Sequence, residues 1–281
     1  MAFNDLDRIY CFSLGDFHNF EKCFFNFLVK HHLQKRYELE EGNKNQAIGN
    51  LLDLVMKIIH RTKAYSQPLD YILNTIFKAA EGEMRDKVER AGSKSFYGTT
   101  IPFLTEETIS KAKEVFKRYY ELRTGKINKV VLDEKFWECI LEGSQLFKIW
   151  GGPDALEMGE DGIAEIVDYK YFEDPQKGKE NLDMDLAPKL YTLLCSSELS
   201  KLEYKKVRFR IRSWNDPLDE SLYEEFDLQI VANLKDFFRL KIEKILGITE
   251  LKFCEKPYCK ACNSTQKQDW IKQLKLKKFI H

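Results

Sequence analysis

Long hydrophobic runs and net charge are both missing from this sequence of 281 residues. No apolar stretch approaches the roughly 20 residues that cross a bilayer, and Met1–Asp7 lacks the basic and apolar regions of a signal peptide. The 45 basic residues balance 45 acidic ones, so any nucleic-acid-binding surface has to be a local patch. Repeats and low-complexity linkers are also absent. These absences predict a cytoplasmic protein without a membrane partner, whose seven cysteines are free thiols or metal ligands.

The hydrophobic content of 43% is enough for a sizeable core, in one large domain or two small ones. Helical periodicity predicts helices over residues 13–27, 46–60, 68–80, 83–90, 105–123, 185–195 and 222–246. Apolar and alternating runs predict strands at 135–141, 145–150 and 205–214. Short turns between consecutive strands predict antiparallel neighbours.

Residues 152–170 are typical of two strands joined by a tight turn. Gly159–Gly162 supplies residues that tolerate the backbone angles of a hairpin, and the β-branched run after it predicts a strand. Such a hairpin brings Asp154 and Asp168 together near one end of a sheet. Lys170 lies on the same face as Asp168, because alternate residues of a strand share a face.

Two carboxylates and an ammonium group in one place can support phosphodiester hydrolysis. Carboxylate oxygens bind Mg²⁺ and leave several of its waters in place, and such an ion can activate a water molecule. A lysine beside them can orient that water or offset negative charge. Spacing alone also fits a turn residue, Asp154, and a solvated pair, Asp168 and Lys170, because this pattern is common by chance.

Cysteines gather late in the sequence. Cys254, Cys259 and Cys262 lie within nine residues, and a Cys-x-x-Cys pair in a reducing compartment is often a metal knuckle. With Cys23 they suggest four thiolates in two groups, which fit a [4Fe–4S] cluster or a tetrahedral Zn²⁺ ion. Alternatively, Cys23 is a small core residue. A metal centre would link two segments that are far apart in the sequence and so stabilise the fold.

Residues 205–214 alternate between apolar and basic side chains, as a strand with one buried face does. The apolar positions are Val207, Phe209 and Ile211, and the basic positions are Arg208, Arg210 and Arg212. The arginines fit either the solvated face of an edge strand or a stripe that binds phosphate oxygens.

The hairpin motif, Gly-x-Asp followed by Ile-Val-Asp-Tyr-Lys, resembles the core of the PD-(D/E)XK nuclease superfamily. More narrowly it resembles the RecB-like branch, which includes AddB-type and CRISPR-adaptation exonucleases. The resemblance implies that Asp154 and Asp168 are ligands of Mg²⁺ or Mn²⁺ and that Lys170 is the catalytic lysine. It also implies that the peptide carbonyl of Tyr169 completes this metal site.

Two earlier segments are similar to the same family. The Ser…Phe…Cys…Phe pattern ending at Phe27 resembles the first helix of iron–sulfur members and implies that Cys23 is a cluster ligand, although Phe24 replaces the usual proline. Gly49 matches a Gly-x-x-x-His helix in which Asp53 takes the place of the metal-binding histidine. Asp53 either binds the ion or is simply a polar position on that helix.

Two later segments complete the resemblance. Tyr191 matches the tyrosine of a Gln-x-x-x-Tyr motif beside the DNA, which implies a strand-positioning role, but Ala187 replaces the glutamine. Cys259 and Cys262 match the terminal cysteine pattern, whereas the third cysteine, Cys254, lies upstream of its usual place. The family implies a [4Fe–4S] cluster at these cysteines, with Zn²⁺ as the alternative.

The resemblance covers nearly the full length and implies an α/β fold. We expect a restriction-endonuclease-like core, with a central mixed sheet flanked by helices, plus a helical insertion. It predicts a single nuclease domain over residues 1–281. The insertion falls at about 60–125, the sheet core at 129–214, and the C-terminal helix and cysteine cluster at 222–281.

The implied function is a Mg²⁺- or Mn²⁺-dependent DNA nuclease that hydrolyses phosphodiester bonds. We expect an exonuclease on single-stranded ends, in DNA repair, recombination or defence, with DNA and a helicase or other nuclease-complex subunit as partners. A catalytically weak DNA- or helicase-binding module is an alternative, motivated by Ala187 and Asp53. A zinc-stapled interaction domain, in which Asp154 and Lys170 are surface residues, is another.

Overall fold

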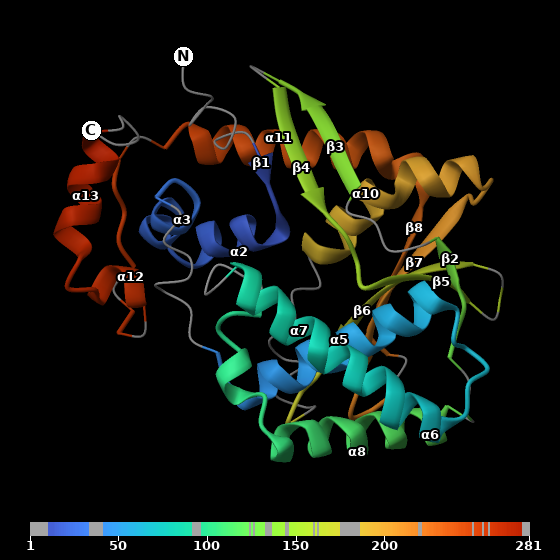
Figure 1. Cartoon of the computed structure of the whole chain (residues 1–281). Coiled ribbons are helices and arrows are strands. Elements are labelled where there is room, and N and C mark those ends of the chain that lie inside the picture. The colour runs from blue at the N-terminus through green and yellow to red at the C-terminus, as the bar shows by residue number, and fades with distance from the viewer. Residues whose placement is uncertain are drawn as a thin grey trace. The chain divides into compact units, whose positions relative to one another are not determined.

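The computed structural model forms two compact units (Figure 1). It describes residues 11–33, 42–91, 97–123, 125, 127–132, 137–143, 146–159, 161, 163–174, 186–218, 221–248, 250–254, 256–257 and 259–276. Unit 1 consists of Met1–Glu40, Phe136–Gly151 and Ile230–His281, and unit 2 of Glu41–Lys135 and Gly152–Gln229. The single nuclease domain stays a prediction. Among the described helices, none is long and apolar enough to cross a membrane.

Unit 2 is built on a five-stranded mixed sheet. Its strands are β2 (Val130–Leu132), β5 (Ala155–Met158), β6 (Ala164–Lys170), β7 (Lys206–Ser213) and β8 (Tyr223–Asp227), in the order β2-β5-β6-β7-β8. The β6–β7 pair is parallel and the other pairs are antiparallel. Strands β5 and β6 form the predicted hairpin, in which Ala155 pairs with Val167.

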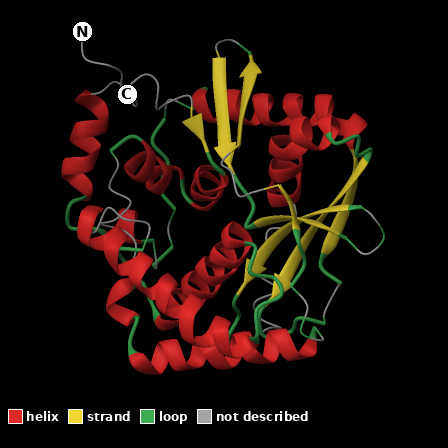
Figure 2. Cartoon of the chain, turned by 45° about the vertical axis from the view of Figure 1, so that its right-hand side comes forward, coloured by secondary structure: helices red, strands yellow, loops and turns green. Residues whose placement is uncertain are grey.

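Helices flank this sheet (Figure 2). They are α5 (Lys44–Thr62), α6 (Leu69–Tyr71), the π-helical turn η1 (Ile72–Ile76), α7 (Phe77–Ala91), the short 3₁₀ turn η3 (Ile101–Phe103), α8 (Glu106–Leu122) and α10 (Leu186–Lys201). The helices from α6 to α8 occupy the region of the expected insertion. Mixed sheets flanked by helices confirm the predicted α/β, restriction-endonuclease-like fold class.

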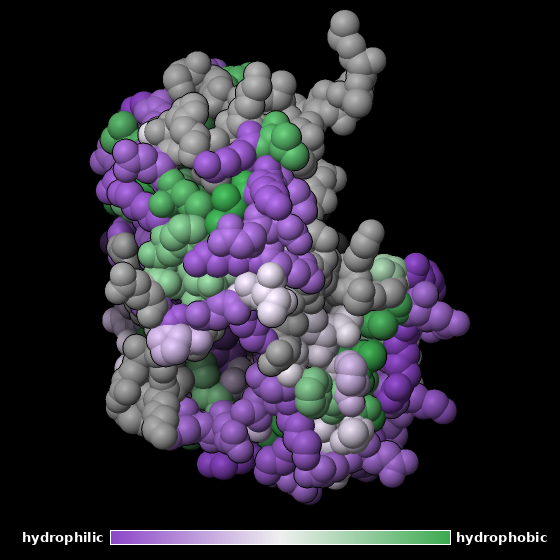
Figure 3. All heavy atoms as spheres, turned by 90° about the vertical axis from the view of Figure 1, so that its left-hand side faces the viewer, coloured by the Kyte–Doolittle hydropathy of each residue, from purple (hydrophilic) through white to green (hydrophobic). Residues whose placement is uncertain are grey.

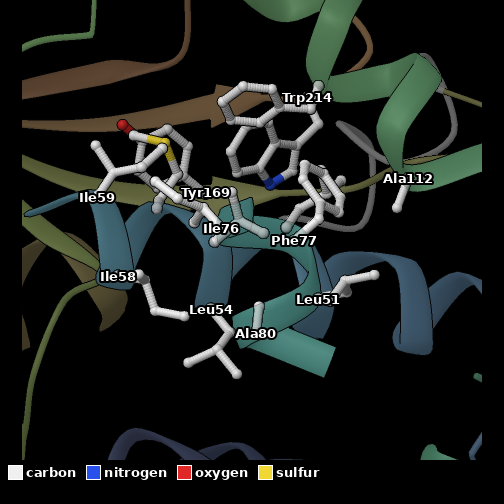
Figure 4. Packing of buried hydrophobic residues seen from close by; sticks show 14 of the residues in the cluster. Leu51, Leu54, Ile58, Ile59, Ile76, Phe77, Ala80, Ala112, Tyr169 and Trp214 are labelled. Carbon is white, nitrogen blue, oxygen red and sulfur yellow. The ribbon is translucent and has the colours of Figure 1, made fainter. Parts of the chain in front are cut away.

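The two faces of the sheet are covered differently. Helices α5, α7 and α8 pack an apolar cluster against the face that carries Val167 and Tyr169, and the Tyr169 ring stacks on Trp214 at 4.9 Å (Figure 4). The residues of β6 that alternate with Val167 and Tyr169 point to the other face of the sheet. That face carries Asp168, and Tyr191 of α10 stacks over it on Phe209, with ring centroids 6.1 Å apart.

The arginines of β7 form a buried ion-pair network. Strand β7 lies between β6 and β8, so it is a central strand and not an edge. Arg212 and Arg210 are only 4% and 6% exposed. Arg212 bonds Glu157 of β5 and Glu165 of β6, and Arg210 bonds Glu165 at 3.1 Å. Both interpretations of these arginines, a solvated face or a phosphate-binding stripe, are therefore wrong for Arg210 and Arg212.

Unit 1 contains a smaller sheet and several helices. Strands β1 (Cys11–Phe12), β4 (Leu146–Gly151) and β3 (Trp137–Glu142) are ordered β1-β4-β3, with β3–β4 antiparallel and β1–β4 parallel. The helices are α2 (Leu14–Lys22), α3 (Phe24–His31), α11 (Val231–Leu246), α12 (Lys260–Asn263) and α13 (Lys267–Leu276). The β3–β4 pair was expected, but it does not belong to the sheet that carries the carboxylates.

The helices predicted over 68–80 and 83–90 are not separate, because α7 continues through residues 81 and 82. Two further predicted helices also differ from the structure. The helix over 13–27 begins as expected, with the Ser13 N–H donating to the Asp16 carboxylate at 2.8 Å, but it is broken at Cys23. This residue is extended, with φ −168° and ψ 116°, and separates α2 from α3. The helix predicted over 222–246 is wrong in its first part, because Tyr223–Asp227 pairs with β7 as strand β8.

We expect Arg212→Ala to destabilise the protein by about 3–5 kcal/mol, because it removes a buried cation that bonds the two buried carboxylates of Glu157 and Glu165. Chemical denaturation measures this loss. Arg61→Ala is the control, since Arg61 pairs with Glu83 at 2.9 Å on the surface and such pairs contribute about 1 kcal/mol or less. Equal losses of stability in the two variants would show that the buried network stabilises the protein no more than a surface ion pair does.

Candidate active site and cysteine centre

Strand pairing in the β5–β6 hairpin fixes the position of Asp154. Its N–H donates to the carbonyl of Val167 at 3.1 Å, and its carboxylate accepts the N–H of Tyr169 at 2.8 Å. The register that pairs Ala155 with Val167, continued by one residue, sets Asp154 opposite Asp168. The structure therefore brings together the two carboxylates that the sequence singled out.

Lys170 belongs to the same group. Its Nζ lies 2.6 Å from Oδ1 of Asp168. Burial by itself lowers the pKa of Lys170, but the carboxylates of Asp168 and Asp154 outweigh it, so the pKa is raised. The ammonium group therefore keeps its proton at neutral pH. It can donate hydrogen bonds and offset negative charge.

Asp53 of α5 also reaches this group. Its carboxylate accepts the indole N–H of Trp214 at 3.2 Å. Burial raises the pKa of Asp53, and the nearby charge of Asp154 raises it further. The residue that replaces the family's histidine is therefore close to the other carboxylates.

Lys170 is near all three carboxylates of this site, and the charge of Lys57 also acts on Asp53. Burial raises the pKa of Asp168 to about 6, Lys170 opposes the rise, and Asp154 adds to it. Burial is the main cause of the raised pKa values of Asp168 and Asp53, and the nearby charge of Asp154 adds to both. Oxygen donors with excess negative charge fit a hard divalent cation such as Mg²⁺ or Mn²⁺, and Asp53, Asp154 and Asp168 are the residues that would hold it.

Tyr169 links the site to the core. Its N–H bonds Asp154 and its hydroxyl donates to the buried Glu157 at 2.6 Å. The sequence interpretation missed both Glu157 and Trp214. Trp214 is the last residue of the predicted strand 205–214 and directly follows β7, which was the available signal for it, whereas nothing in the sequence pairs Glu157 with Tyr169.

Tyr191, on α10, lies beside the carboxylates of the hairpin. Burial raises its pKa, and so does the charge of Asp168, which places the phenol near that carboxylate. The hydroxyl group is therefore protonated at neutral pH and can act as a donor. Ala187, which replaces the family's glutamine one turn earlier, is buried and offers no polar group.

The four predicted cysteines converge in unit 1. The sulfur atoms of Cys23, Cys254, Cys259 and Cys262 all lie within 4.8 Å of one another. The Sγ atoms of Cys23 and Cys262 are 3.4 Å apart, and those of Cys254 and Cys262 are 3.8 Å apart. Cys254, which departs from the family's spacing, therefore joins the group.

The sulfur separations bear on which metal these cysteines could hold. Bonds of about 2.3 Å to one tetrahedral ion put thiolate sulfurs roughly 3.8 Å apart. A [4Fe–4S] cluster needs more room, because iron and sulfide ions lie between the thiolates. The donor set fits a metal centre, and the Cys23–Cys262 and Cys254–Cys262 separations are close to the value for a single ion such as Zn²⁺.

The family comparison covers most of the chain. A family model described as the PD-(D/E)XK nuclease superfamily matches residues 12–266. No curated protein matches the chain in sequence.

Solved structures give only distant similarities. The crystal structure of SSO0001 is 12% identical, with a TM-score of 0.23, over 75% of this chain and 82% of that one. A crystal structure of Rai1 from Scheffersomyces stipitis is 11% identical, with a TM-score of 0.23, over 86% of this chain and 70% of that one. Scores this low support no argument about fold or function.

We expect the purified protein to contain metal that Cys259→Ser removes, and its melting temperature to fall by several degrees, because a structural centre contributes folding energy. Elemental analysis and the visible spectrum of anaerobically purified protein measure this. Zinc near one per chain follows from the sulfur separations, and iron near four per chain from the resemblance.

The matched control is Cys139→Ser, because Cys139 is half-buried in β3 and is not among the four clustered cysteines. Its metal content should equal that of the parent protein. A metal-free parent protein would show that the four cysteines are ordinary thiols.

Proposed function

The chain belongs to the PD-(D/E)XK nuclease superfamily, and we propose that it is a Mg²⁺- or Mn²⁺-dependent deoxyribonuclease that hydrolyses phosphodiester bonds. The observation that carries this proposal is the hairpin geometry. Asp154 stands opposite Asp168, whose carboxylate is ion-paired to Lys170 at 2.6 Å. These are the residue types and positions that the family motif requires.

Each residue of the site has a role in this proposal. Asp154, Asp168 and Asp53 hold the divalent ion, together with the peptide carbonyl of Tyr169. When bound, such an ion supplies a water of lowered pKa and stabilises charge on the phosphate. Lys170, which keeps its proton, orients the attacking water and offsets developing negative charge. Tyr191 positions the strand by donating a hydrogen bond from its hydroxyl group to a phosphate oxygen.

We assign the chain further to the RecB-like branch. The support is the four-cysteine centre, whose ligands match that branch at Cys23, Cys259 and Cys262. Exonuclease action on single-stranded DNA ends, in repair, recombination or defence, follows from this assignment. A helicase or another subunit of a nuclease complex would then supply the unwound strand.

A catalytically weak binding module is the second candidate. The buried Ala187 favours it, because α10 then lacks the family's polar contact to the DNA. The proximity of Asp53 to Asp154 favours the nuclease, because it restores a third metal-binding group. Mn²⁺ binding that depends on Asp154 would separate both candidates from a zinc-stapled interaction domain in which Asp154 has no role.

We expect Asp168→Ala to abolish DNA cleavage, with a loss of at least 100-fold, because it removes a metal ligand and the partner of Lys170. Folding and DNA binding should be largely unchanged. The measurement is Mn²⁺-dependent degradation of an end-labelled single-stranded oligonucleotide, compared with circular dichroism of the same preparations.

Asp70→Ala is the matched control, because Asp70 is an exposed carboxylate of unit 2 in the first turn of α6. It should cleave at the parent rate. Full cleavage by Asp168→Ala, in a preparation free of contaminating nuclease, would overturn the assignment.

A further inference from the structure

Trp214 connects two elements of the candidate active site. It directly follows β7, is fully buried, and its ring lies beside that of Tyr169 (Figure 4). Its backbone N–H donates to the carbonyl of Lys170 at 2.9 Å, and its indole N–H donates to Oδ1 of Asp53 at 3.2 Å. One residue is therefore bonded both to the end of β6 and to α5.

Helix α5 also approaches the end of β6 directly. A Cβ atom added at Gly49 would lie 3.5 Å from Cβ of Tyr171, so the helix passes within contact distance of the residue that follows Lys170. Asp53 lies one turn further along the same helix. The charges of Asp154 and Lys170 both act on its carboxylate. The position of α5 therefore brings Asp53 to the carboxylate site.

The choice of acceptor for the indole N–H is informative. A buried indole N–H needs an acceptor, and a backbone carbonyl would meet that need without taking a charge out of water. Here the acceptor is the carboxylate of Asp53. The bond engages Oδ1, so a cation can bind through the other oxygen. Hydrogen bonds of this kind commonly orient the groups that bind metal ions.

Neighbouring rings fix the direction of the indole N–H. The centroid of the Trp214 ring lies 4.9 Å from that of Tyr169, 4.8 Å from that of Tyr119 and 6.2 Å from that of Phe116. All four residues belong to the apolar cluster or contact it within unit 2. A side chain packed this closely cannot turn without displacing its neighbours. The N–H can therefore hold the Asp53 carboxylate in one orientation.

Surface features of the described part of the chain identify no ligand as clearly. Figure 3 looks onto the side that carries α12 and α13 in Figure 1 and shows hydrophilic residues with smaller hydrophobic groups between them. Three apolar side chains of β3 and β4 are exposed, namely Ile140, Leu146 and Trp150, but nothing in the structure shows what covers them. Both partners of the bond between Trp214 and Asp53, in contrast, are defined.

We propose that Trp214 is a positioning residue, which holds Asp53 in the orientation that binds the divalent ion of the carboxylate site. The inference rests on the proposed function, because it concerns the ion that the nuclease would use. Trp214 is not a ligand itself, since an indole N–H is a donor only. It acts through the carboxylate of Asp53.

The first test compares the Mn²⁺ affinity of Trp214→Phe with that of the full-length parent protein, without DNA. Phenylalanine keeps an aromatic ring in the cluster but lacks the N–H. We expect Mn²⁺ binding to weaken by about tenfold or more, because losing the hydrogen bond that orients a ligand has an effect of this size. Electron paramagnetic resonance of free Mn²⁺ during a titration measures the affinity.

A second variant separates the loss of the N–H from the change in ring size. Benzothienylalanine at position 214 keeps two fused rings and has sulfur in place of the indole N–H. Its Mn²⁺ affinity should fall as in Trp214→Phe, while its melting temperature should stay closer to that of the parent. Parent-like Mn²⁺ affinity in both variants would overturn the inference.

A double-mutant cycle tests whether Trp214 acts through Asp53. In the Asp53→Ala protein, adding Trp214→Phe should change the Mn²⁺ affinity by less than about twofold, because the carboxylate that the N–H orients is gone. A further loss as large as the one in the parent background would show that the substitution disturbs the site through the core. That result would also overturn the inference.

Phe116→Leu is the matched control, because Phe116 is fully buried in the same cluster. It should lower the melting temperature but leave the Mn²⁺ affinity within about twofold of the parent value. An equal loss of affinity in Phe116→Leu and Trp214→Phe would show that any defect in the cluster weakens the site, and would contradict a specific role for the indole N–H.

Cleavage assays separate this inference from the proposed function. Parent protein whose Mn²⁺ affinity depends on Trp214 and Asp53, but which does not cleave DNA, would support the inference and refute the nuclease. Parent protein that cleaves DNA, with parent-like Mn²⁺ affinity in both Trp214 variants, would refute the inference alone. Parent protein that binds no Mn²⁺ would refute both.

Discussion

A single buried carboxylate connects the core of unit 2 to the candidate active site. Glu157 is fully buried and accepts bonds from the Tyr169 hydroxyl, Asn128 and Arg212. A buried charge is stable only when its partners satisfy it. Because Tyr169 is held by Glu157 through its hydroxyl and holds Asp154 through its N–H, the position of a proposed metal ligand depends on an ion pair beneath the sheet.

The sequence predicted the local part of this arrangement well. Turn residues and a period of two were enough to pair β5 with β6 and to place Asp154, Asp168 and Lys170 together, because these are consequences of one hairpin. Asp53 and Tyr191 come from distant helices. Only the resemblance to a family could relate them to the hairpin, since no local rule sets which helix packs beside which strand.

The features that the sequence did not predict depend on which residues contact one another in the fold, and periodicity does not reveal this. Alternation in residues 205–214 identified two faces of a strand, but not that Glu157 and Glu165 neutralise the basic one. The aromatic spacing before and after Cys23 continued through the break, so it predicted one helix where the structure has two. Strand β8 buries only Phe226 among its five residues, which leaves too weak a pattern to distinguish it from the start of a helix.

The division of the chain has a consequence for how the molecule is made. Unit 1 is assembled from three separate stretches, the last of which starts at Ile230, whereas every residue of unit 2 precedes that point. During synthesis from the N-terminus, the larger sheet can therefore complete its strands while the final stretch is still unmade. Cys23 precedes Cys254, Cys259 and Cys262 by more than 200 residues, so the four cysteines can come together only after Cys262 has been synthesised.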